Sequence, residues 1–275
     1  MNNYVQHTKQ ISYDYLYDKA PTSEERKQEY YCHMHNDYEL LFFFDGNIDY
    51  IIENSQYHLN KNDLLLIKPM TLHGANILSP QPYERIVINF NRLALPESYE
   101  NILKDLGSVY HIQNGSPIYN LFYNLRACEK FFNEEEFTFL KTSTLYNAIA
   151  NLHYLSSEEF EETHHNLLDD IIKYIQENPE LPLTSQVLAN KFYVSKSWID
   201  HNFKTHLNLS PKQYINQKKI LYAQSLILSG ESISEVVERC NYVNYTTFYR
   251  QYKSILNKEP QQDKLPTTPH NLRKK

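Results

Sequence analysis

The last third of the chain contains the same pattern twice: a short helical segment, a turn of a few residues and a second helical segment. In the first copy the helical segments are 185–192 and 196–206, and Thr184 and Ser195 are suited to cap them. Two helices joined by so short a turn form a helix-turn-helix motif, whose second helix is shaped to enter the major groove of DNA. The pattern therefore predicts a DNA-binding unit.

The second copy follows a long helical segment, 211–228. Its own helical segments are 233–240 and 245–256, and Asn244 is placed to cap the latter. Two such motifs joined by one helix would present their second helices to successive major grooves on one face of DNA, roughly 34 Å apart.

Many residues of this region match one family. The stretch from about Leu167 to Pro260 resembles the DNA-binding domain of the AraC/XylS family of bacterial regulators. The matching residues are Tyr174, Ile175, Glu177, Asn178, Leu188, Ala189, Phe192, Val194, Ser195, Ile199, Phe203, Lys204, Ser210, Pro211, Tyr214, Ile215, Ala223, Ile233, Val236, Tyr242, Phe248, Tyr252, Lys253 and Pro260. The match spans nearly the whole C-terminal third, so it is far more specific than a lone helix-turn-helix pattern. It implies that the partner is double-stranded promoter DNA and, for an activator, RNA polymerase.

The chain departs from the family at several turn positions. Asn208, Asn241 and Asn257 stand where glycine is common. Asparagine is the non-glycine residue that best adopts the left-handed conformation, so we expect the fold to be kept. Lys219 replaces the usual arginine, and a lysine cannot make a bidentate contact.

The predicted DNA-binding residues are those that face outward on the two second helices. They are Lys196, Ser197, Asp200, His201, Lys204, Tyr245, Thr246, Tyr249, Arg250 and Lys253. The resemblance places Ser197, Asp200 and His201 at base-facing positions; Asp200 would either accept a hydrogen bond from cytosine N4 or discriminate against a wrong site. Arg250 is the best single candidate for base recognition, because arginine can contact guanine O6 and N7 together.

The lysines of this set are candidates for phosphate contacts, and the alternative for each is a solvated surface charge. Tyr245 and Tyr249 either face DNA or pack under their helix. Phe248 and Tyr252, four residues apart on one face, are better candidates for the core.

The N-terminal half reads as short strands separated by turns, over 38–44, 48–53, 56–60, 63–68 and 84–90. Such close spacing predicts a β-sandwich or barrel. The run Leu-Leu-Phe-Phe-Phe within the first strand does not alternate with polar residues, so we expect that strand to be buried on both faces.

Several residues here resemble the two motifs of the cupin barrel, as found in the sensor domains of the same regulator family. They are His33, Met34, His35, Glu39, Gly46, Pro69 and His73; Asn62 replaces a usual glycine. The resemblance implies a small-molecule effector pocket with His35, Glu39 and His73 in its polar lining, and this is the favoured interpretation, with no cofactor. The alternative is that His33, His35, Glu39 and His73 bind a divalent metal, as their equivalents do in metal-binding cupins.

Helical periodicity returns over 118–132 and 134–155, which predicts a helical hairpin. Its apolar stripe either covers the sheet or also forms the seam of a homodimer. We expect a cupin-like sensor domain over 1–115, the hairpin over 116–156, a linker over 157–166, the DNA-binding domain over 167–265 and a basic tail over 266–275. The fold class is α+β, with an all-α C-terminal domain.

Composition sets limits on the function. The 275 residues suffice for two domains, and no stretch is apolar enough for a membrane span. Because the first ten residues lack the features of an export signal, we expect a cytoplasmic protein. The net charge is −6, but basic residues are concentrated in the last third. The 3 cysteines show no metal-binding spacing, and with 5 glycines and no P-loop or GxGxxG motif an enzyme is not expected.

The favoured hypothesis is therefore a sequence-specific transcription regulator that responds to an effector, with activation favoured over repression. The alternatives are a constitutive regulator without an effector and, less favoured, a metal-dependent cupin enzyme.

Overall fold

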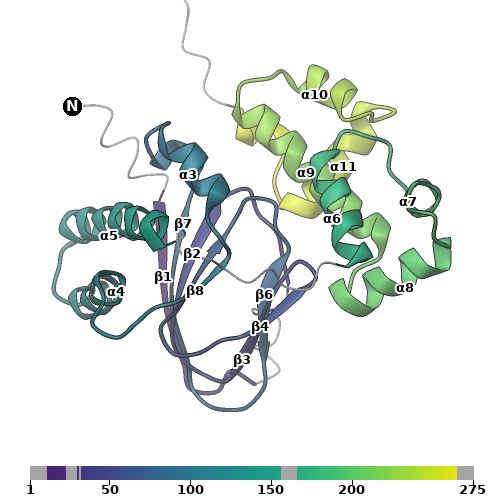
Figure 1. The fold of residues 1–275 in the computed structure, drawn as a ribbon. Helices are drawn as coiled ribbons and strands as arrows, with labels where there is room; N and C mark the ends of the chain where they lie inside the picture. Colours follow the sequence, from purple (N-terminus) through teal and green to yellow (C-terminus); the bar gives the residue numbers. More distant parts are fainter. Residues whose placement is uncertain (1–10, 23–29, 31, 156–165, 265–275) are drawn as a thin grey trace, which may run out of the picture. The chain divides into compact units, whose positions relative to one another are not determined.

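The computed structural model describes residues 11–22, 30, 32–155 and 166–264. The chain divides into two compact units, Met1–His164 and His165–Lys275, which are described separately (Figure 1). The predicted linker lies outside the described residues except for Asn166, and so does the predicted basic tail.

The first unit consists of two antiparallel sheets. Its strands are β1 (Ile11–Asp18), β2 (Tyr38–Asp45), β3 (Ile48–Ile52), β4 (Ser55–His58), β5 (Asp63–Ile67), β6 (His73–Ile77), β7 (Tyr83–Phe90) and β8 (Val109–His111). The five-stranded sheet has the order β1-β7-β2-β5-β8, and the three-stranded sheet has the order β4-β3-β6. The sandwich predicted from the strand spacing is confirmed.

The central strand β2 separates two hydrophobic cores. Leu41 and Phe43 pack with residues of β3 in the interior between the sheets, whereas Leu40, Phe42 and Phe44 point to the opposite face. All five side chains are buried, as their lack of alternation with polar residues predicts.

Two helices, α4 (Pro117–Cys128) and α5 (Glu134–Leu155), cover that opposite face of the large sheet (Figure 1). Phe122 of α4 stacks on Phe42 with ring centroids 4.6 Å apart. The apolar stripe of the hairpin therefore closes the core of its own sheet. The prediction that the first helix reaches residue 132 is wrong: the amides of Phe131 and Phe132 both bond to the carbonyl of Cys128, which turns the chain towards α5.

Three strands and a short helix were not predicted. In β1 only the two end residues are fully buried, and β8 has three residues, so neither carries a clear hydrophobic pattern. Strand β6 holds His73 and Gly74 in place of β-branched residues. No side chain caps the start of helix α3 (Tyr99–Asp105), so the sequence gives no capping signal there.

The second unit is helical throughout. Its helices are α6 (Leu167–Glu177), α7 (Ser185–Phe192), α8 (Lys196–Leu207), α9 (Pro211–Leu228), α10 (Ile233–Arg239), α11 (Tyr245–Leu256) and the 3-10 turn η3 (Pro260–Asp263). The predicted caps are confirmed, because the side chains of Thr184, Ser195 and Asn244 accept amide hydrogen bonds at the first turns of α7, α8 and α11. Asn166, predicted as the end of the linker, instead caps α6.

The asparagines at turn positions adopt the left-handed conformation. Asn208, Asn241 and Asn257 have φ of 54°, 51° and 53°, and Asn62 of the first unit has φ of 72°. Asn208, Asn241 and Asn257 keep their turns without glycine, as predicted, and Asn62 adopts the same conformation. No helix within the described residues is long and apolar enough to cross a membrane.

Candidate nucleic-acid interface and ligand cavity

The second helix of each motif presents one polar face and one buried face. On α8, Ile199, Phe203 and Leu207 are buried, while Ser197 and His201 are exposed. This is the orientation that major-groove contact requires of a reading helix. Lys204 is also exposed and donates to the side chain of Asn208 at 3.2 Å.

Asp200 on α8 is already engaged within the protein. Its carboxylate accepts hydrogen bonds from the hydroxyl of Ser185, at 2.8 Å, and from the ammonium group of Lys196. These two hydrogen bonds lower the pKa of Asp200. The role in base recognition considered from the sequence would require at least one of these bonds to open, so the contacts observed favour a structural role.

On α11, Phe248 and Tyr252 are buried, which confirms the prediction that both belong to the core. Tyr245 and Thr246 are exposed and Tyr249 is half-buried. Arg250 is exposed, and within the described part of the chain no hydrogen bond or ion pair engages its guanidinium group. Its five donors are therefore available to a partner.

The turn η3 and Glu259, the residue before it, make contacts that sequence reasoning missed. The hydroxyl of Tyr249 donates to Glu259 at 2.7 Å, and the amide of Gln261 donates to the hydroxyl of Tyr245 at 2.9 Å. Lys253 lies 3.5 Å from Glu259. These contacts hold both tyrosines on the polar face of α11, and no sequence motif predicts the contacts.

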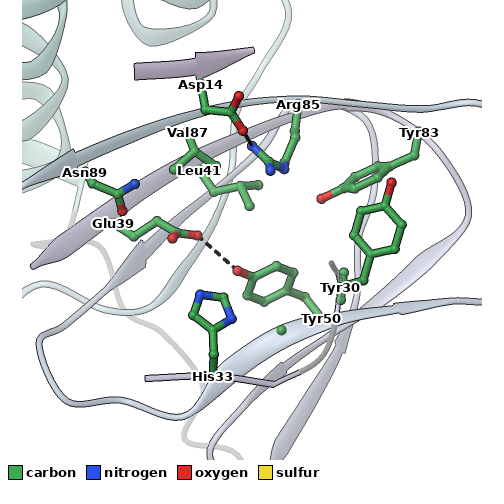
Figure 2. A pocket seen from close by; sticks show the side chains of 12 residues that line it. Asp14, Tyr30, His33, Glu39, Leu41, Tyr50, Tyr83, Arg85, Val87 and Asn89 are labelled. Carbon is green, nitrogen blue, oxygen red and sulfur yellow. Dashed lines mark hydrogen bonds and ion pairs between the residues drawn. The ribbon is translucent and has the colours of Figure 1, made fainter. Parts of the chain in front are cut away.

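The first unit contains a cavity of about 260 Å³ between its two sheets (Figure 2). Its polar lining consists of Asp14, Tyr30, His33, Glu39, Tyr50, Tyr83, Arg85 and Asn89. Arg85 pairs with Asp14 at 2.9 Å, and Tyr50 donates to Glu39 at 3.1 Å. Burial and the nearby Glu39 carboxylate raise the pKa of Tyr50 well above its usual value, so Tyr50 is a hydrogen-bond donor at neutral pH.

Most of these lining residues were not identified from the sequence, although one signal was present. Arg85, Val87 and Asn89 alternate along β7, and alternate residues of a strand share a face. Two polar residues on one face of a largely buried strand therefore indicate a polar cavity on that face.

The structure brings together the histidines and the glutamate singled out in the sequence. One ligand atom from each of His33, His35, Glu39 and His73 lies within 4.8 Å of the others. Glu39 and His33 line the cavity, whereas His35 and His73 contact Glu39 without lining it. Burial alone would raise the pKa of Glu39, but hydrogen bonds from His35 and His73 outweigh it and hold this pKa well below its usual range.

Comparison with known proteins assigns both units. Residues 22–166, more than half of the chain, match a model described as the AraC-like ligand binding domain, and residues 188–264 match one described as a helix-turn-helix domain. The chain belongs to the AraC family of transcription regulators. The family resemblance and the α+β fold expected from the sequence are confirmed, and the assignment is to regulators rather than to enzymes.

Individual transcription regulators are similar over much of this chain. The uncharacterized HTH-type transcriptional regulator YdiP of Escherichia coli is 24% identical over 247 residues, which cover 84% of this chain and 79% of YdiP. The HTH-type transcriptional activator RhaR of Salmonella arizonae is 21% identical, covering 78% of this chain and 80% of RhaR. Crystalline ToxT of Vibrio cholerae is 13% identical, covers 92% of this chain and 97% of its own, and gives a TM-score of 0.39, which is too low to support a conclusion.

Proposed function

We propose that this AraC-family protein regulates transcription in response to a small-molecule effector bound in the cavity of its first unit. The observation that carries the proposal is the polar cavity itself, which lies inside the part of the chain that matches the AraC-like ligand binding domain. Its lining carries several side chains that can donate to or accept from a polar molecule, as small-molecule sites do. Constitutive regulation without an effector is the competing hypothesis.

The chemistry of the cavity limits the effector. Arg85 and the hydroxyls of Tyr50 and Tyr83 can donate hydrogen bonds, while Glu39 and Asn89 can accept them. The volume of about 260 Å³ lies just below the range of roughly 300–1,000 Å³ typical of sites for drug-sized ligands. We therefore expect a small, polar, uncharged molecule rich in oxygen atoms.

We further propose that α8 and α11 read promoter DNA and that Arg250 makes the main base contact. The support is the exposed guanidinium of Arg250, which has no partner among the described residues, in contrast to Lys196 and Lys253, which face carboxylates. Ser197 and His201 of the first motif offer weaker donors for guanine. Action on promoter DNA implies a cytoplasmic location.

A homodimer formed through the hairpin and activation through RNA polymerase are parts of the same proposal. Phe139 on α5 is 63% exposed, and Phe131, in the turn before α5, is 83% exposed. Exposed aromatic side chains of this size are enriched at protein interfaces. Activation is supported only by the similarity to RhaR, whose name describes an activator.

Two measurements test the proposal. Footprinting with genomic fragments from the neighbourhood of the gene should show protection of about two helical turns per protomer. Thermal unfolding in the presence of a panel of sugars and metabolites should reveal a ligand that raises the melting temperature by mass action. That ligand should also change the affinity for the protected fragment; a ligand that stabilises the protein without changing its DNA binding would contradict an effector role.

A further inference from the structure

Glu259, the residue before η3, contacts the polar face of α11. Its Oε1 accepts from the hydroxyl of Tyr249 at 2.7 Å and lies 3.5 Å from the ammonium group of Lys253. Tyr249 and Lys253 are four residues apart, so they share one stripe along the helix. This stripe belongs to the face that was proposed above to read DNA, and Glu259 changes what the stripe offers to a base.

The first motif has a different residue at the corresponding place. Residues 208–211 follow α8 as residues 257–260 follow α11, and Glu259 stands where the first motif has Ser210. Ser210 caps the next helix, since its hydroxyl accepts from the amide of Gln213. Glutamate is not among the favoured capping residues. The contact of Glu259 with α11 is therefore a feature of the second motif and not a requirement of the turn.

The turn η3 is anchored to both neighbouring helices. Asp263, its last residue, is buried and accepts from Gln224 of α9 at 3.1 Å and from Tyr252 of α11 at 2.5 Å. The ammonium group of Lys258 also donates to Asp263, at 2.7 Å. Glu259 lies between Lys258 and η3, so these contacts hold it beside α11.

The proton between Tyr249 and Glu259 has a defined direction. Their hydrogen bond raises the pKa of Tyr249 and lowers the pKa of Glu259, so Tyr249 keeps its proton and Glu259 is ionised at neutral pH. An ionised carboxylate only accepts, so the single hydroxyl proton of Tyr249 points to Glu259. The oxygen of Tyr249 then has only lone pairs to offer to another partner.

Tyr245, one turn earlier on α11, has the opposite arrangement. Its hydroxyl oxygen accepts from the side-chain amide of Gln261 at 2.9 Å, so its proton is available for donation. The ring centroids of Tyr245 and Tyr249 are 5.9 Å apart. Two neighbouring hydroxyls therefore differ in hydrogen-bonding character because η3 and Glu259 treat them differently.

Duplex DNA offers few donors to an acceptor such as Tyr249. Phosphate oxygens only accept, so neither the Tyr249 oxygen nor the Glu259 carboxylate can form a hydrogen bond to the backbone. In the major groove the base donors are the amino groups at adenine N6 and cytosine N4, whereas guanine and thymine present acceptors there. Adenine or cytosine therefore satisfies the Tyr249 oxygen, and guanine or thymine does not.

We propose that Glu259 determines the base preference of the second motif. By taking the proton of Tyr249, it makes this tyrosine select adenine or cytosine over guanine or thymine at one position of the binding site. Glu259 is a positioning residue, because it acts through Tyr249. Its carboxylate also offsets the charge of Lys253, which weakens sequence-independent attraction to the backbone. The inference rests on the proposed reading of DNA by α11.

The test is selection of binding sites from a random duplex library by the full-length protein. The wild-type protein should prefer adenine or cytosine at one position by at least about fivefold. Tyr249→Phe removes only the hydroxyl, so it should abolish this preference and leave the salt dependence of binding unchanged. The amide introduced by Glu259→Gln can donate to Tyr249, as Gln261 donates to Tyr245, so guanine and thymine should become accepted at the same position.

Glu238→Gln is the matched control, because it removes the same charge from an exposed position of α10. It should leave the selected sequence unchanged. The inference is overturned if Tyr249→Phe and Glu259→Gln select the same bases as the wild-type protein. It is also overturned if Glu259→Gln steepens the salt dependence without changing the base preference, because Glu259 would then act on Lys253 alone.

The same selection separates this inference from the proposed function. A wild-type protein that selects a sequence which neither variant changes still reads DNA, and only the role of Glu259 and Tyr249 is lost. A wild-type protein that selects no sequence contradicts the proposed reading of DNA itself, and this inference fails with it.

Discussion

The hydroxyl of Ser185 donates a hydrogen bond of 2.8 Å to the carboxylate of Asp200, which ties the start of α7 to the middle of the reading helix α8. The same carboxylate accepts from Lys196, one turn earlier on α8. Asp200 was predicted from the resemblance to face the bases. In the structure its carboxylate instead joins the two helices of the first motif and offsets the charge of Lys196.

Replacement of Asp200 by asparagine should therefore strengthen DNA binding in general. The amide oxygen can still accept from Ser185, but Lys196 loses its ionic partner and becomes free to contact phosphate. The slope of log affinity against log salt should steepen by about one, for operator and unrelated DNA alike. The measurement is a salt series on both fragments, and a loss of affinity confined to fragments with one particular base pair would show instead that Asp200 reads cytosine.

Arg250→Ala should abolish specific binding, whereas Ser197→Ala should only weaken or relax it. A bidentate arginine–guanine contact is worth about 1–3 kcal/mol, or roughly 5- to 150-fold in affinity. Arg239→Ala is the matched control, because Arg239 carries the same charge on α10 but is bound to Glu231 at 2.7 Å. Fluorescence anisotropy with the footprinted fragment measures all three variants. Similar losses from the Arg250 and Ser197 substitutions would mean that both motifs contribute equally to recognition.

The helical unit could be predicted from the sequence almost in full because its signals are local. Ser195 and Asn244 cap helices within three residues of themselves, and the asparagines at 208, 241 and 257 take up a conformation that depends on their own backbone. Burial of Phe248 and Tyr252 follows from their spacing along one helix.

The cavity could be predicted only in part, because it is built from contacts between distant strands. Arg85 pairs with Asp14 only because β1 pairs with β7. The β1 segment has little hydrophobic alternation, so its sequence does not predict this pairing. The proximity of His33 and His73 was suggested by the cupin resemblance, but the bridge between them depends on Gly74, which lies 42 residues after the Cys32 backbone that it contacts. Long-range pairing of this kind leaves no local signal.

Tyr193 gives a prediction about stability. It ends α7 in the left-handed conformation, with φ of 57°, and its side chain is 96% exposed, so the side chain contributes no packing to offset the strain. A non-glycine residue in this conformation destabilises the folded state by about 1–2 kcal/mol. Glycine removes this strain, but part of the gain is lost because glycine raises the conformational entropy of the unfolded chain. Tyr193→Gly should therefore raise the free energy of unfolding by about 0.5–1 kcal/mol in urea denaturation.

Tyr193→Ala is the control for this change. It removes the same exposed ring but keeps a Cβ, so the backbone strain persists and stability should not increase. Equal stabilisation by alanine and glycine would show that the ring itself, and not the backbone, is unfavourable.

Gly74→Ala should disrupt the segment that carries His33. The added Cβ would lie 2.8 Å from both the nitrogen and the Cα of Cys32 and 2.9 Å from the carbonyl oxygen of Tyr30, all of them backbone atoms that cannot rotate away. Overpacking of this kind typically costs about 1–3 kcal/mol, and here the bridge between His33 and His73 must open to relieve it. Gly107→Ala is the control, because its nearest neighbour is the hydroxyl of Tyr110 at 3.6 Å, an ordinary contact distance. Urea denaturation of both variants should show lower stability for the Gly74 variant alone; unchanged stability of that variant would mean that the segment around Cys32 does not pack against β6 in solution.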